Sequence, residues 1–312
     1  MRGISYLSDQ VPEQDVHRDL AIIHGELGCD AVLVKGNDAT RQIEAAASAL
    51  DLGLEVWIEA QRENARPRAA LDHLGTVAVA AERLRVRHPG RVTLVVGCEL
   101  SLLTRGLVPG PVTFVRLMLI LRAGNRLRRR ITRGLRRRLA DAREVAARHF
   151  HGPVTYAAAL WEQVDWSGFD VVAVNLYRIG ADTAGYAERV RALVQGTDKP
   201  VVITEFGCGA HRGAELRGPG SFLIVNWFAQ PPRIKRGHVR DESVQARYLL
   251  ELLDVFDASG VHGAFVFTYV MPAFPRSPDP AYDLDMAGFG VVTAPGGERK
   301  AAFDALSRRF AH

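Results

Sequence analysis

Eight short runs of aliphatic and β-branched residues recur along this chain, and helical periodicity separates most of them. The predicted strands are Gly3 to Leu7, Ala31 to Val34, Leu54 to Ile58, Val92 to Val96, Val154 to Ala158, Val171 to Asn175, a run from Val201 that ends at Glu205, and Gly263 to Phe267. This alternation favours a parallel sheet with right-handed crossovers. No dinucleotide-binding glycine motif follows the first strand, so a closed barrel is favoured over an open sheet. The prediction is an α/β fold, a single (β/α)8 TIM barrel over residues 1–312.

Two connections are longer than a barrel requires. The connection after the fourth strand contains a glycine–proline loop and an arginine-rich helical insertion at about residues 112–150. The connection after the seventh strand, residues 208–242, shows no clear periodicity. Long loops of this kind are usually functional or mobile. The fifth unit is the weakest, because Trp161 to Ser167 leaves little room for a helix.

Composition sets limits on location and chemistry. Hydrophobic residues make up 47% and charged residues 24% of the chain, as in globular proteins. No apolar run reaches the roughly 18 residues that span a bilayer, and the start of the chain is too brief for a signal peptide. The three cysteines lack metal-ligand spacing, which indicates free thiols and a cytoplasmic location. Neither a metal nor a cofactor is predicted.

Two of the buried strands end in glutamate. Glu205 closes the run that begins Lys199-Pro-Val-Val-Ile, and Glu99 follows Val92-Thr-Leu-Val-Val-Gly-Cys. In a parallel barrel the carboxyl ends of the strands point into the active site, so a charge placed there indicates chemistry. Strands four and seven lie roughly across the barrel mouth from each other. The pair therefore fits glycoside cleavage, which needs one carboxylic acid and one carboxylate on opposite sides of a sugar ring.

These motifs resemble those of the clan A glycoside hydrolases, the barrels with catalytic glutamates at the ends of strands four and seven. Thr204-Glu-Phe-Gly207 resembles the nucleophile strand of that clan, and Asn175-Leu-Tyr177 resembles its sixth strand. Gly263-Ala-Phe-Val-Phe-Thr-Tyr269 is similar to the eighth strand, which usually supplies an aromatic sugar platform. The resemblance implies a retaining mechanism with Glu205 as nucleophile and Glu99 as general acid/base. It also implies a hydrogen bond from Tyr177 to the nucleophile.

The chain departs from the clan pattern at two positions. Cys98 stands where the clan has asparagine before its acid/base, and Phe267 or Tyr269 replaces the usual tryptophan of the eighth strand. The whole chain, including Glu99-Leu-Ser-Leu-Leu and Asp283-Leu-Asp285, also resembles bacterial proteins labelled abortive infection proteins.

Further residues at the predicted mouth are candidates for substrate binding. They are Asn175, Tyr177, Glu59, Gln61, Trp161, Trp227, Tyr269, Asp283 and Asp285. Several also have structural interpretations: Glu59 and Gln61 as rim residues, and the two aspartates as turn formers. Trp57 lies within an apolar strand and is predicted to be core, and Cys98 is predicted to line the wall of the site.

The net charge of +5 is concentrated in one segment, because ten arginines lie between Arg122 and Arg143. Leu127, Ile131, Leu135 and Leu139 recur every four residues among them, which predicts a basic amphipathic helix. Its cationic face is either solvated or binds an anionic partner such as lipid, nucleic acid or an acidic protein.

The predicted function is a glycosidase that acts on a small-molecule carbohydrate or glycoside. Two alternatives remain. The same carboxylates would serve acid/base chemistry on a non-sugar metabolite, such as cyclisation or rearrangement, an option motivated by Cys98. Otherwise, the chain is a non-catalytic binding or phage-defence protein that acts through its basic helix.

Overall fold

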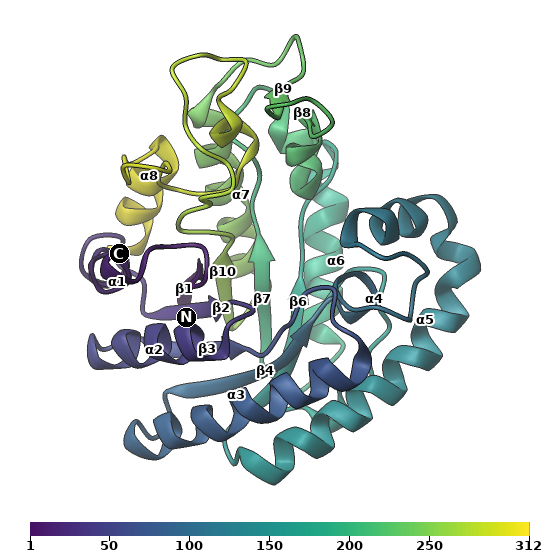
Figure 1. Ribbon diagram of the computed structural model, residues 1–312. Coiled ribbons are helices and arrows are strands. Elements are labelled where there is room, and N and C mark those ends of the chain that lie inside the picture. Colours follow the sequence, from purple (N-terminus) through teal and green to yellow (C-terminus); the bar gives the residue numbers. More distant parts are fainter. Residues whose placement is uncertain (312) are drawn as a thin grey trace.

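The computed structural model describes residues 1–311, and eight parallel strands in it close into a barrel (Figure 1). The strands are β1 (Arg2–Leu7), β2 (Ala31–Lys35), β3 (Glu55–Glu59), β4 (Val92–Cys98), β5 (Val154–Ala158), β6 (Val172–Asn175), β7 (Val201–Phe206) and β10 (Gly263–Val266). Each barrel strand pairs with the next barrel strand along the chain, and β1 closes the ring by pairing with both β2 and β10. The predicted (β/α)8 barrel is confirmed.

The helices surround the barrel and join consecutive strands (Figure 1). They are α1 (Glu13–Gly25), α2 (Ala39–Asp51), α3 (Pro67–Arg87), α4 (Leu100–Leu103), α5 (Thr113–His149), α6 (Thr183–Gln195), α7 (Glu242–Ser259) and α8 (Ala301–Phe310). Asp38 caps α2 by accepting hydrogen bonds from the backbone of Thr40 and Arg41. The fifth unit has only the single turn η1 (Trp166–Gly168) in place of a helix. The segment after Trp161 is therefore too short for a helix, as the sequence predicts.

Large side chains fill the inside of the barrel. Trp57 is 3% exposed, and its ring packs 5.3 Å from that of Phe265, which confirms its predicted core position. Gly3 makes this packing feasible, because a Cβ atom there would lie 2.3 Å from the Phe265 ring. A second, larger apolar layer lies between the strands and the outer helices. The barrel is thus a packed core, and an opening can form only at its ends.

The arginine-rich segment is the outer helix of the fourth unit. Helix α5 packs against α3, its neighbour around the barrel, so the predicted insertion at 112–150 takes the place of a regular barrel helix. It kinks at Ala123, where the backbone is non-helical. Ile131, Leu135 and Leu139 are buried, as their spacing predicts.

The long connection after β7 is ordered by its own small core. It contains the turns η2 (Ala214–Leu216) and η3 (Gly218–Ile224) and the hairpin of β8 (Val225–Asn226) and β9 (Arg233–Ile234). Apolar residues of this connection pack on the segment after β10, which includes the turn η4 (Leu284–Ala287). Together these segments build the upper part of the molecule in Figure 1.

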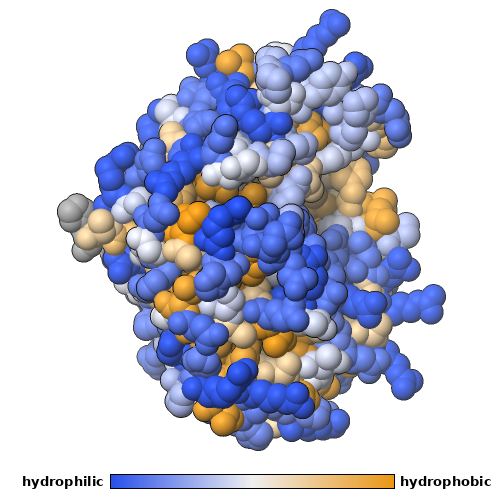
Figure 2. All heavy atoms as spheres, turned by 60° about the vertical axis from the view of Figure 1, so that its left-hand side comes forward, coloured by the Kyte–Doolittle hydropathy of each residue, from blue (hydrophilic) through white to orange (hydrophobic). Residues whose placement is uncertain are grey.

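Polar residues cover most of the outer surface on the side that carries α1, α2 and α8 (Figure 2). In the described part of the chain, no helix combines the length and the apolar character that crossing a bilayer requires.

Candidate active site

A cleft of about 260 Å³ opens at the carboxyl ends of the strands. Its lining comes from the ends of β1, β2, β3, β4 and β7, from the loops after β1, β2, β3 and β10, and from α4: Leu7, Asp9, Gln10, Lys35, Gly36, Asn37, Glu59, Gln61, Glu63, Cys98, Glu99, Leu103, Glu205, Phe267 and Met271. Glu99 and Glu205 are therefore brought together in one cleft. Their placement follows from the parallel sheet, in which every strand end reaches the same face.

Glu205 lies near the end of β7, with its side chain 12% exposed. The Tyr177 hydroxyl donates a hydrogen bond to its Oε2 at 2.8 Å, and the Lys35 ammonium forms an ion pair with its Oε1. Burial, followed by the charge of Glu205, raises the pKa of Tyr177 well above its usual range, so the phenol stays a neutral donor. These two contacts hold both carboxyl oxygens of Glu205 in place.

Glu99 occupies a backbone conformation that residues other than glycine rarely adopt. Its φ is +39°, in the left-handed region, between the end of β4 and the start of α4. Strain of this kind clusters at functional sites, where the surrounding structure holds the residue in place. The side chain accepts a 3.0 Å hydrogen bond from Asn175 Nδ2. Burial, and then the charge of Glu205, raises the pKa of Glu99 to about 8.

The two glutamates thus have different environments in the same cleft. Glu99 retains its proton at neutral pH, because the hydrogen bond from Asn175 only partly offsets burial and the charge of Glu205. Glu205 has a cation and a hydroxyl donor against its two oxygens. A carboxylic acid beside a carboxylate is the pairing that acid/base and nucleophilic chemistry require.

Asn175 and Cys98 connect the two glutamates. Thr204 donates a 2.8 Å hydrogen bond to Asn175 Oδ1, which fixes the amide so that its Nδ2 faces Glu99. The same Nδ2 lies 3.4 Å from Cys98 Sγ, and that sulfur lies 3.8 Å from Glu205 Oε1. Burial, and then the charge of Glu59, raises the pKa of Cys98 well above its usual range. Cys98 is therefore a neutral wall residue, as predicted.

Lys35 is a cleft residue that is not among the candidates predicted from the sequence. It ends β2 and forms ion pairs with Glu205 and, at 2.8 Å, with Glu59 Oε2. Burial alone would lower the pKa of Lys35, but its acidic neighbours outweigh this and raise it well above the ordinary value. The rule that selected the glutamates, a charge at the end of a buried strand, applies equally to this lysine.

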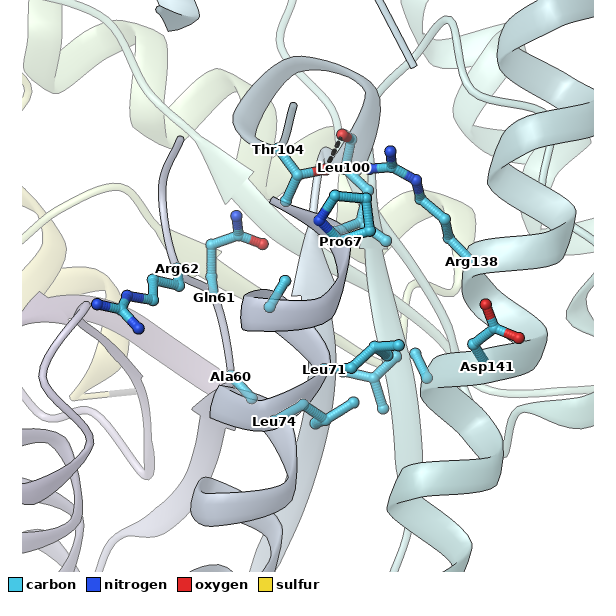
Figure 3. A pocket seen from close by; sticks show the side chains of 13 residues that line it. Ala60, Gln61, Arg62, Pro67, Leu71, Leu74, Leu100, Thr104, Arg138 and Asp141 are labelled. Atoms are coloured by element: carbon cyan, nitrogen blue, oxygen red, sulfur yellow. Dashed lines mark hydrogen bonds between the residues drawn. The ribbon is translucent and has the colours of Figure 1, made fainter. Parts of the chain in front are cut away.

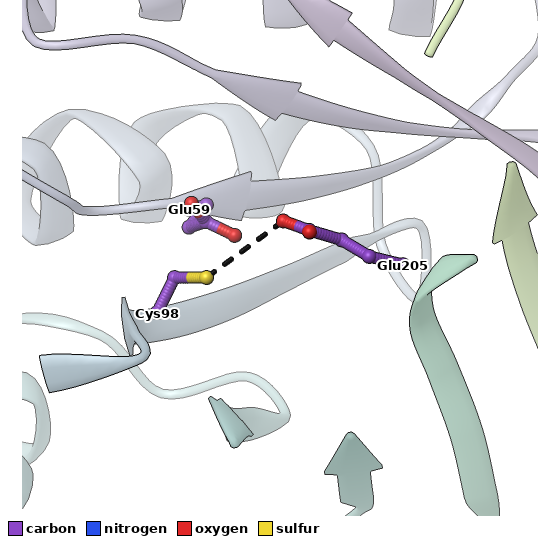
Figure 4. Close-up of side chains that lie close together, drawn as sticks. All are labelled: Glu59, Cys98 and Glu205. Carbon is purple, nitrogen blue, oxygen red and sulfur yellow. Dashed lines mark hydrogen bonds between the residues drawn. The ribbon is translucent and has the colours of Figure 1, made fainter. Parts of the chain in front are cut away.

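Glu59, Cys98 and Glu205 also bring three metal-type ligand atoms within 4.8 Å of one another (Figure 4). The Lys35 ammonium already lies against both carboxylates and neutralises much of their charge. A metal ion would have to displace this ammonium, so the donor set fits a lysine-centred ion-pair network better than a metal site.

Gln61 and Trp161 lie at the edges of this arrangement. Gln61 Oε1 accepts a hydrogen bond from the Cys98 backbone at 3.0 Å, while its buried Nε2 has no partner in the described chain. Gln61 also lines a smaller cavity of about 40 Å³ between α3 and α5 (Figure 3). Trp161 donates a hydrogen bond to Ser101 Oγ and borders a separate hollow beside α5.

A buried carboxylate supports the loop that carries Glu99. Glu162 accepts hydrogen bonds from the backbone of Ser101 and Ala159 and from the Tyr156 hydroxyl, at 2.6 to 3.0 Å. The Tyr156 hydroxyl in turn accepts one from the Leu100 backbone at 2.7 Å. This network holds the first turn of α4 in place. No local pattern marks Glu162, because it follows β5 inside an irregular loop.

Besides Trp161, four predicted binding residues are not brought to the cleft. Tyr269 is 2% exposed and packs on Tyr6 in the core, and the ring of Trp227 packs edge-to-face with Phe274, outside the lining of the cleft. Asp283 and Asp285 are buried in ion pairs whose partners are Arg240, Arg276 and Lys300. The two aspartates thus stabilise the segment after β10. Phe267 is the aromatic residue of that strand end that lines the cleft.

The chain shares its fold with solved glycosidase structures. A GH113 beta-1,4-mannanase aligns with a TM-score of 0.62 at 17% identity, over 99% of this chain and 98% of that one. GH113 beta-mannanase AaManA from Alicyclobacillus acidocaldarius aligns at 0.64 and 14%, over 100% and 96%. A β-glucuronidase from Ruminococcus gnavus aligns at 0.61 and 15%, over 99% of this chain and 49% of that one. No family model and no curated protein matches the sequence. At such identities the similarity establishes the fold alone.

Proposed function

We propose that this protein is a retaining glycoside hydrolase, with Glu205 as nucleophile and Glu99 as general acid/base. The observation that carries the proposal is the unequal environment of two carboxyl groups in one cleft. Glu99 has a pKa of about 8, whereas the carboxylate of Glu205 is held by Tyr177 and Lys35. Retaining glycosidases require one carboxylic acid and one carboxylate at neutral pH.

In the first step, a Glu205 oxygen attacks the anomeric carbon and the bond from that carbon to the leaving oxygen breaks. Glu99 gives its proton to the leaving oxygen. The new bond is an ester between the sugar and Glu205. Tyr177 donates to the other Glu205 oxygen, which keeps the carboxylate in a fixed orientation during attack.

In the second step, water attacks the anomeric carbon, the ester breaks and Glu205 is released as a carboxylate. Glu99 now takes a proton from the water. Forming the ester removes the negative charge of Glu205, which is the second largest cause of the raised Glu99 pKa. The pKa of Glu99 therefore falls in the intermediate, and the group that acted as an acid becomes a base.

The charges around the cleft favour a neutral sugar. Besides Glu99, which keeps its proton, the acidic residues along the lining are Asp9, Glu59, Glu63 and Glu205, and within the described lining Lys35 is the only cation. Lys35 is already paired with two of these carboxylates. A sugar with its own carboxylate would enter a negative site with no free cation, so we propose a neutral β-linked glycoside, as in the mannanase neighbours, over a glucuronide.

Acid/base chemistry on a non-sugar metabolite remains the second candidate, and Cys98 is its motivation. A thiol is a weak hydrogen-bond donor, so this position offers less to a sugar hydroxyl than an amide side chain would. The bacterial abortive infection resemblance also remains a prediction, as does a cytoplasmic location.

The test is hydrolysis of 4-nitrophenyl β-mannoside, β-glucoside and β-glucuronide, with the anomer released first identified by proton NMR. We expect turnover of a neutral substrate with retention of the β configuration. We also expect that Glu205→Gln abolishes turnover, while Glu188→Gln, an exposed residue on α6, leaves it unchanged. An α anomer as first product, or wild-type rates for Glu205→Gln, would refute the proposal.

A further inference from the structure

The arginines of α5 form an unpaired cationic surface. Eight of them, Arg122, Arg126, Arg128, Arg129, Arg130, Arg133, Arg136 and Arg137, are exposed. In the described chain, the only ion pair made by an α5 side chain is the one between Arg148 and Glu144, beyond this cluster. The proposed glycosidase chemistry uses none of these arginines.

Exposed apolar side chains lie beside the arginines. A hollow of about 640 Å³ at the kink of α5 is lined by Ile120, Leu121, Arg122, Ala123, Gly124, Asn125, Arg126, Arg128, Leu160, Trp161 and Gln163. Leu121 is 63% and Leu160 is 55% exposed, while Phe114 on the first limb of α5 is 45% exposed. No carboxylate is present in this described lining. The hollow therefore offers cations and apolar contacts together.

The opposite side of α5 is anchored firmly. Ile131, Leu135 and Leu139 are buried against the barrel, and the fully buried Arg116 donates hydrogen bonds to the Leu102 and Gly110 carbonyls at 2.5 and 3.0 Å. The helix cannot turn its apolar stripe outward without losing this core. Whatever binds must therefore do so through the arginines and the exposed leucines, along the outer edge of the molecule (Figure 1).

We propose that this surface, defined by the lining of the hollow and the exposed arginines of α5, binds a membrane that contains anionic lipid. Interfacial helices combine arginines, which attract lipid phosphates, with apolar side chains, which enter the acyl boundary. Nucleic acid would use the cations but would gain little from exposed leucines. The inference is independent of the proposed glycosidase activity.

The test is co-sedimentation of the full chain with two kinds of vesicle. One kind is phosphatidylcholine alone, and in the other about 30% of the lipid is phosphatidylglycerol, which makes the vesicle surface anionic. We expect binding to the anionic vesicles only, weakened by added salt. Each arginine near such a surface contributes roughly fivefold to affinity. Replacing Arg122, Arg126 and Arg128 together with glutamine should therefore weaken binding roughly 100-fold.

A matched control separates local contacts from net charge. The control variant replaces three exposed arginines of α3 and α6 with glutamine, Arg83, Arg87 and Arg191, and so loses the same charge. If vesicle binding depends on the arginines of α5 and not on net charge, its affinity should stay within about twofold of wild type. Equal weakening by both triple variants would overturn the proposal, as would failure to bind anionic vesicles at low salt.

A second variant separates membrane from nucleic acid. Leu121→Ser with Leu160→Ser removes exposed apolar surface and should weaken vesicle binding about tenfold, with circular dichroism unchanged because both leucines are exposed. Two results together would assign the surface to nucleic acid instead. The protein would bind a single-stranded RNA as tightly as it binds the anionic vesicles, and the double variant would bind the vesicles as tightly as wild type does.

Discussion

Glu99→Gln should stabilise the fold while it abolishes turnover. The folded protein raises the pKa of Glu99 from 4.5 to about 8, with burial as the main cause. Between these values the unfolded chain releases the proton and the folded chain keeps it. Folding stability therefore falls as pH rises, by about 1.4 kcal/mol per pH unit. At pH 7 the penalty amounts to about 3 kcal/mol.

Glutamine removes this penalty and preserves the geometry. Its amide oxygen can still accept the hydrogen bond that Asn175 Nδ2 donates to Glu99 Oε1 at 3.0 Å. Urea unfolding of wild type and variant should show a stability gain that is small at pH 5 and reaches about 3 kcal/mol at pH 7.

The exposed Glu188→Gln variant is the control, with an expected change below about 0.5 kcal/mol at each pH. A stability difference between wild type and Glu99→Gln that does not vary with pH would show that folding does not raise the pKa of Glu99.

Three other predictions concern the cleft. The kcat of wild type should fall above about pH 8, where Glu99 loses the proton it must donate, as a pH–rate profile would show; a constant kcat up to pH 10 would contradict this. Tyr177→Phe removes the donor to Glu205 Oε2 and should lower kcat at least tenfold in steady-state assays without loss of secondary structure; a kcat within twofold of wild type would leave the hydroxyl without a role. Lys35→Met leaves the buried Glu59 and Glu205 without their cation and should lower the free energy of unfolding in urea by about 3 kcal/mol at pH 7 and by less at pH 5. An equal loss of stability at both pH values would show that the unpaired carboxylates are not its cause.

The barrel could be predicted from the sequence because its signals are local. Each strand is a short apolar run with a polar stop, and the arrangement of parallel strands then places all stops on one face. Glu99, Glu205 and Tyr177 follow from that rule and from the resemblance to clan A. The rule does not reveal which charges pair, since the contact of Lys35 with Glu205 joins residues 170 positions apart in the chain.

The aromatic and aspartate candidates show that a position after a strand end does not by itself place a side chain in the cleft. Tyr269 lies only two residues beyond Phe267, yet it packs in the core while Phe267 lines the cleft. The orientation of a loop side chain depends on tertiary contacts that no local pattern records. Asp283 and Asp285 are candidates because they follow the eighth strand, but Arg240, in a distant part of the chain, pairs with both.

The backbone of Glu99 was likewise beyond sequence reasoning. A left-handed conformation is expected at glycine or asparagine, and a glutamate there gives no signal in the sequence. The network of Glu162 and Tyr156 that holds the following turn depends on contacts across 56 to 61 residues. The strain at Glu99 is evident only in the folded structure.

Covalent trapping of the nucleophile tests the assignment of Glu205 most directly. The protein would be incubated with the 2-deoxy-2-fluoro β-glycosyl fluoride of the neutral sugar that it hydrolyses best, and the adduct located by peptide mass spectrometry. We expect one sugar per chain, attached to Glu205, and no adduct in Glu205→Gln. An adduct on another residue, or continued turnover without any adduct, would contradict the assignment of Glu205 as nucleophile.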